Sequence, residues 1–229
     1  MKRSNLSKST LSSIDSKEFS RKMAIHEAGH AAAIYLGNKQ KQLPPVFFQI
    51  YINELNRNDP LPRCPHQSNT NWFAKVEDGR LIHTLPSSFD EATRDFSELQ
   101  KQAYKEAFEA DIINLLVGPL AEANYVALCD DEPINPHLVN LPALHNYGGT
   151  SDLEIANEYI ECFISDKTQR EKKISELFLA AFNFINIRSN WLAIVALADY
   201  ILANSKNIIE CEEIISVLDA HFFVTGKTV

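Results

Sequence analysis

The sequence has little of what marks a membrane-spanning, disulfide-rich or nucleic-acid-binding protein. Its 229 residues contain no run of 18 or more apolar residues, which argues against a membrane span. Lys and Arg number 22 against 30 Asp and Glu, and the resulting net charge of −8 argues against phosphate-backbone binding. The four cysteines are far apart, with no CxxC pair among them: Cys64, Cys129, Cys162 and Cys211. We therefore expect no nucleic-acid partner, no disulfide framework and no cysteine-based zinc ribbon.

The same cysteine usage favours a reducing compartment, so we expect a cytoplasmic protein and leave an organelle stroma or matrix open. The first 23 residues are rich in serine and carry six basic and two acidic side chains. They lack the apolar core of a secretory signal. We expect residues 1–16 to be a disordered, basic lead-in and residues 17–229 to form one domain.

With only seven glycines and no internal repeats, the chain is expected to be rich in helix. Apolar residues at helical spacing predict a first helix over residues 17–37, which Gly37 and Asn38 would end. Three β-rich stretches, at 46–53, 72–76 and 80–85, predict a small sheet. The predicted fold class is mainly α (α+β), with a small β-sheet and a C-terminal helical hairpin.

Residues 90–128 are again helical in pattern, and Pro119 within them predicts either a helix end near Gly118 or a kink. Ser151 followed by Glu154 has the spacing of a capping box, which predicts a helix start at Ser151. Three further helices are expected at about 168–187, 189–204 and 208–223. The Pro-rich and polar stretches 54–71 and 129–147 are expected to be loops.

The segment with the clearest chemistry is His26-Glu27-Ala28-Gly29-His30, an HExxH pattern inside the first predicted helix. Residues four apart lie on one helix face, so both imidazoles can reach one metal ion. Zinc bound this way lowers the pKa of a water molecule, and a neighbouring carboxylate can accept the proton. The pattern therefore predicts His26 and His30 as zinc ligands and Glu27 as the general base.

A catalytic zinc needs a third protein ligand, and two carboxylates are candidates. Asp152 follows Gly148 and Gly149, which let the backbone approach closely, and it lies in the first turn of a predicted helix. Glu122 lies in an apolar helix, where an unpartnered carboxylate is costly, so it is either a ligand or the partner of a ligand histidine. His145 lies near Asp152 in the sequence and is a weaker candidate for lining the site.

Four segments resemble the peptidase domain of the FtsH-type proteases, the ATP-dependent zinc metalloproteases of bacteria and organelles. They are KMAIHEAGHAAAIYLG, LLVGPLAEANYV, GGTSDLEIANEYI and NWLAIVALADYILANSKNIIECEEIISVLDAHF, which occur in the same order over residues 20–222. The resemblance implies a zinc metalloendopeptidase, with His26, His30 and Asp152 as ligands and Glu27 as catalytic base. It places Glu122 beside the metal rather than on it.

The chain also departs from that family. It contains no G-x-x-x-x-G-K-[ST] motif, so we expect no ATP binding of its own, and we expect no counterpart of the family's membrane anchor. Ala123 stands where the family has a second Glu. We expect a peptidase domain acting without its own ATPase on peptides or unfolded protein segments. A homo-oligomer or a separate partner ATPase stays open.

The alternative hypothesis is a non-catalytic, zinc-bound regulatory domain that docks onto a partner protease or a membrane complex. The missing ATPase motivates this hypothesis. Glu27 argues against it, because a purely structural zinc site has no use for a carboxylate at that position.

Overall fold

The computed structural model describes residues 8–53 and 73–222 and confirms a mainly helical fold with a small antiparallel sheet. The elements in chain order are α1 (Lys8–Ala32), η1 (Ala33–Gly37), α2 (Asn38–Gln40), β1 (Phe48–Ile52), β2 (Ala74–Asp78), α3 (Phe89–Ala92), α4 (Glu98–Cys129), η2 (Leu141–Tyr147), α5 (Thr150–Phe163), α6 (Lys167–Asn186), α7 (Arg188–Ala203), β3 (Ile208–Ile209) and α8 (Cys211–Phe222). The loop predicted at 54–71 lies outside the described residues.

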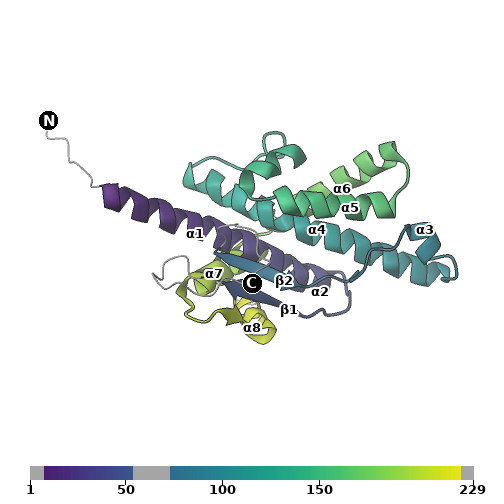
Figure 1. Cartoon of the computed structure of the whole chain (residues 1–229), viewed down its shortest axis with the longest axis horizontal. Coiled ribbons are helices and arrows are strands. Elements are labelled where there is room, and N and C mark those ends of the chain that lie inside the picture. The colour runs from purple at the N-terminus through teal and green to yellow at the C-terminus, as the bar shows by residue number, and fades with distance from the viewer. Residues whose placement is uncertain (1–7, 54–72, 223–229) are drawn as a thin grey trace, which may run out of the picture.

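The two longest helices, α1 and α4, lie against each other through the middle of the molecule (Figure 1). Helices α5 and α6 contact α4, whereas β2 and α7 contact α1, and α8 contacts both α7 and β1. Figure 1 shows α5 and α6 above the central pair and the sheet with α8 below it. The buried apolar residues form a single core cluster that draws on the central pair, the sheet and the C-terminal helices.

Helix α1 differs from its prediction at both ends. It begins at Lys8, so residues 8–16, expected as a disordered lead-in, are helical. At the other end, the chain passes through one π-helical segment, η1, and continues to Gln40 in α2. Gly37 and Asn38 therefore do not stop the helix, because both keep right-handed helical backbone angles.

Helix α4 starts at a capping box in which Ser97 and Gln100 bond each other's backbone amides. Pro119 lies inside this helix, which runs unbroken to Cys129 past the predicted break near Gly118. Its length and apolar composition would let it cross a membrane, but 61% of its most apolar 18-residue stretch is buried inside the protein. That burial is what the central helix of a folded core requires.

The sheet has the strand order β2-β1-β3, and both pairings are antiparallel. Two predicted strands correspond to β1 and β2, but the third prediction, at 80–85, was wrong. Residues 81 and 82 instead donate their backbone amides to the buried carboxylate of Asp111 on α4, which holds this segment out of the sheet. The third strand is the two-residue β3, which lies in the stretch expected to begin the last helix.

Helix α5 begins at Thr150, one residue before the predicted start, and the predicted capping box of Ser151 and Glu154 was wrong. The N-cap residue is Gly149, and no side chain caps this helix. The predicted loop 129–147 ends in the short 3-10 helix η2, which leads to Gly148 in the left-handed conformation. The three C-terminal helices α6, α7 and α8 match their predicted positions within a few residues.

Candidate metal centre

His26 and His30 lie one turn apart on α1, on the side of the helix that packs against α4. Their ring centroids are 4.8 Å apart, and the side chains are only 9% and 11% exposed. Burial of two neighbouring imidazoles is unusual for a helix unless they have polar partners. The partners come from α4 and α5.

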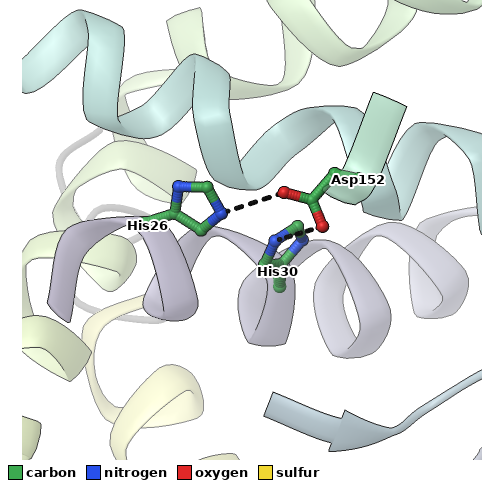
Figure 2. A group of neighbouring side chains, drawn as sticks. All are labelled: His26, His30 and Asp152. Atoms are coloured by element: carbon green, nitrogen blue, oxygen red, sulfur yellow. Dashed lines mark hydrogen bonds and ion pairs between the residues drawn. The ribbon is translucent and has the colours of Figure 1, made fainter. Parts of the chain in front are cut away.

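Asp152, in the first turn of α5, is the partner that the two histidines share (Figure 2). Its Oδ2 lies 3.2 Å from Nε2 of His26, and its Oδ1 lies 3.5 Å from Nε2 of His30. Ligands of a tetrahedral zinc with bonds near 2.0–2.1 Å are roughly 3.3 Å apart. Among the described residues, these three form the one group whose ligand atoms all lie within 4.8 Å of one another. Their chemistry and spacing therefore fit a zinc ion.

Each histidine is held through its other ring nitrogen. Nδ1 of His30 lies 2.8 Å from the backbone carbonyl oxygen of Asn114, and Nδ1 of His26 lies 3.1 Å from Oε2 of Glu122. A carbonyl oxygen and an ionised carboxylate can only accept, so both Nδ1 atoms donate. When an imidazole is neutral, donation from Nδ1 leaves the lone pair on Nε2, the nitrogen that faces Asp152, and this is the tautomer that a metal ligand needs.

Glycines on the opposing elements allow this close approach. A Cβ at Gly118 on α4 would clash with the ring of His30, and one at Gly148 would lie 3.1 Å from Oε2 of Glu122 and 3.2 Å from Nδ1 of His26. Gly29, between the histidines, faces Ala121 in the same way, with 2.8 Å to its Cβ. Small residues at these crossings set the spacing between α1, α4 and the start of α5.

The charges of the three side chains are coupled. Burial alone lowers the pKa of His26, but its hydrogen bonds with Asp152 and Glu122 outweigh burial and raise the pKa well above the ordinary value. Burial also lowers the pKa of His30, but the charge of Asp152 and its hydrogen bond together outweigh burial and raise this pKa. Burial tends to raise the pKa of Asp152, yet the two histidines hold it well below its usual range. Asp152 is therefore ionised, and the space between Asp152 and the two histidines favours a positive charge.

Glu27 lies between the histidines in the sequence and lines the same cleft. Its Oε2 accepts a hydrogen bond of 2.6 Å from the backbone amide of Val76 on β2. Burial raises the pKa of Glu27, although the charges of His26 and His30 act in the opposite direction. The predicted base therefore faces the strand side of the cleft.

The cleft has a volume of about 970 Å³ and lies between α1, α4, β2 and the start of α5. Sequence reasoning missed several of its lining residues, among them Arg80, His83, Asp111 and Asn114. Asp111 could have been found, because an acid within the apolar stretch of α4 is costly unless it is partnered. Nothing in the sequence indicated Asn114, which acts on His30 through its backbone.

Among the other histidines, His83 lines the cleft but does not belong to the ligand group. His145 is exposed, does not line the cleft and has its Nδ1 3.4 Å from Oγ1 of Thr150. His137 and His221 are also exposed, and His66 lies outside the described residues.

Comparison of the chain with protein-family models, with curated proteins and with solved structures finds no match in any of the three.

Proposed function

We propose that this protein is a zinc-dependent endopeptidase in which His26, His30 and Asp152 hold the metal and Glu27 is the general base. The observation that carries the proposal is the placement of Asp152 against both Nε2 atoms at distances that suit a tetrahedral zinc. A zinc ion held there would polarise the scissile carbonyl and lower the pKa of the attacking water. Three protein ligands leave the fourth position open for that purpose.

The chain's own residues would transfer the protons and orient the two imidazoles. Glu27 takes a proton from the attacking water as the new carbon–oxygen bond forms, and it later gives the proton to the amine nitrogen as the carbon–nitrogen bond breaks. Glu122 and the carbonyl of Asn114 keep the two imidazoles in the required tautomer throughout. The raised pKa of Glu27 suits a group that must both accept and return a proton.

The shape of the site supports a peptide as substrate. Strand β2 lines the cleft and, in the part of the chain that the structure describes, pairs with a strand on one side only. An edge strand offers unpaired backbone amides and carbonyls to an extended peptide. The sequence has no phosphate-binding loop motif, so we propose peptides or already unfolded segments as substrates, with membership of the FtsH-type family as the accompanying hypothesis.

The test compares wild type with Glu27→Gln in two assays, zinc content and cleavage of unfolded casein. Zinc content should be about one per chain in both proteins, because Glu27 is not a ligand. Cleavage should be lost in Glu27→Gln, because the amide cannot act as the base. Equal cleavage by both proteins would assign the activity to a contaminant. Zinc binding without cleavage of any unfolded substrate would favour the non-catalytic docking domain instead.

A further inference from the structure

Among the described residues, β2 pairs with a strand on one side only, and the backbone groups that point to its other, free edge can be identified one by one. The amide of Asn53 bonds the carbonyl of Phe73, and the amide of Gly79 bonds the carbonyl of Phe47. In an antiparallel pair, residues alternate between those that bond the partner strand and those that point away from it. The even-numbered residues of β2, which are Ala74, Val76 and Asp78, therefore direct their backbone groups away from β1 and toward the free edge.

The pairing on the other side of β1 supports this assignment. Ile52, which is the register partner of Ala74, donates its amide to the carbonyl of Asn207 on the β3 side. Because register partners in a non-hydrogen-bonded pair point in opposite directions, the amide of Ala74 points to the free edge. Val76 is the partner of Ile50 and belongs to the same alternating set.

One of these outward amides is already used within the chain. The amide of Val76 donates to Oε2 of Glu27 at 2.6 Å, across 49 residues of sequence. A carboxylate has two oxygens, so this bond fixes the plane and direction of the side chain and leaves Oε1 for the attacking water. This bond gives the Glu27 side chain a defined orientation. His26 and His30, on the same helix, face the proposed metal position instead.

We propose that the backbone amide of Val76 is a positioning group for the general base and is not a binding group for the substrate backbone. The inference rests on the proposed function. It means that a bound peptide pairs with β2 through the outward amides of Ala74 and Asp78 and skips the amide at Val76. The strand edge then serves two tasks at adjacent positions, which are to orient the base and to align the substrate.

Proline substitutions separate these tasks, because proline removes an amide hydrogen and is tolerated on edge strands where that hydrogen faces away from the sheet. Val76→Pro should keep about one zinc per chain and lower kcat by about tenfold or more, with KM within about twofold of wild type. The matched control, Ala74→Pro, removes an outward amide that substrate would use, so it should raise KM and leave kcat nearly unchanged. Lys75→Ala, an exposed change on the same strand, keeps every outward amide and should retain wild-type kcat.

The outcomes are distinct. A rise in KM without loss of kcat in Val76→Pro would overturn the proposal, because it would assign this amide to the substrate. An equal loss of kcat in both proline variants would overturn it too, because strand disruption would then be the cause. If Val76→Pro does not fold, replacing Val76 by its α-hydroxy acid removes the same hydrogen without fixing φ, and the same fall in kcat is expected. Absence of cleavage by wild type would count against the proposed function, whereas normal kcat in Val76→Pro alongside an inactive Glu27→Gln would count against this inference alone.

Discussion

The two walls of the cleft are held in place by different interactions: close packing of helices on one side and backbone hydrogen bonds on the other. On the helix wall, α1, α4 and the start of α5 approach so closely that glycines are needed at Gly118 and Gly148, and side chains of α1 and α5 meet around one point. On the strand wall, β2 and the residues after it are held by backbone hydrogen bonds, to Glu27 and to Asp111. Under the proposed function, the helix wall would hold the metal ligands, and the strand wall would orient the base Glu27 and face the substrate.

This difference suggests that metal binding and turnover can be damaged separately. A change on the helix wall moves a ligand by steric contact, so zinc and activity should be lost together. A change on the strand wall leaves the ligands in place, so zinc should be kept while activity falls. The following variants test that separation, from the largest expected effect to the smallest.

Asp152→Asn should have the largest effect, because it replaces the carboxylate that both histidines share. Zinc affinity should fall by more than about 100-fold, which exceeds the range typical for residues that only hydrogen-bond a ligand. Isothermal titration of the metal-free protein with zinc measures the change. Ser151→Ala, at the exposed neighbouring position, is the control and should bind zinc like wild type.

Gly118→Ala should weaken zinc binding by about 100-fold, because the added Cβ would clash with the ring of His30 and push Nε2 away from Asp152. Gly37→Ala, in the π-helical segment η1 that continues α1, is the control, since the nearest atom to its Cβ, in the ring of Phe184, is 3.7 Å away. Both changes raise helix propensity, so only the clash separates them. Equal zinc affinity in the two variants would contradict the close-packed helix wall.

Glu122→Gln should reduce zinc affinity or activity by about 10–100-fold and leave the three ligands unchanged. The amide oxygen can still accept from Nδ1 of His26, but it no longer carries the charge that supports this histidine. Zinc titration and casein cleavage measure the two effects. Complete loss of the metal would show instead that Glu122 is itself a ligand.

Asp111→Asn tests the strand wall. The amide side chain can accept only one of the two backbone hydrogen bonds from Leu81 and Ile82, so the free energy of unfolding should fall by roughly 2 kcal/mol. Zinc affinity should stay within about twofold of wild type, because no ligand contacts this residue. Urea unfolding and zinc titration give the two numbers. Asp95→Asn, an exposed change on the segment before α4, should alter neither.

The sequence predicted the helix wall better than the strand wall. HExxH has a fixed geometry within one helix, and the acid after two glycines identified Asp152, which the structure brings against both histidines. The structure also places Glu122 on Nδ1 of His26, as expected for a residue beside the metal. The ligand roles themselves stay predictions until a metal is measured.

The strand wall depended on contacts that periodicity cannot show. Residues 80–85 have the composition of a strand, but the carboxylate of Asp111, far along the chain, takes their amides. The capping box at Ser151 has the correct spacing, yet the helix begins one residue earlier, at Thr150, with Gly149 as its N-cap. The amide that orients Glu27 belongs to the backbone and has no side-chain signature at all.

The most direct test is a crystal structure of the zinc-loaded protein with anomalous data collected at the zinc edge. We expect one peak within about 2.0–2.2 Å of Nε2 of His26, Nε2 of His30 and an oxygen of Asp152, with Glu27 on the strand side of the metal. A peak bonded to Glu122 with Asp152 turned to solvent, or no peak between the two histidines, would contradict it.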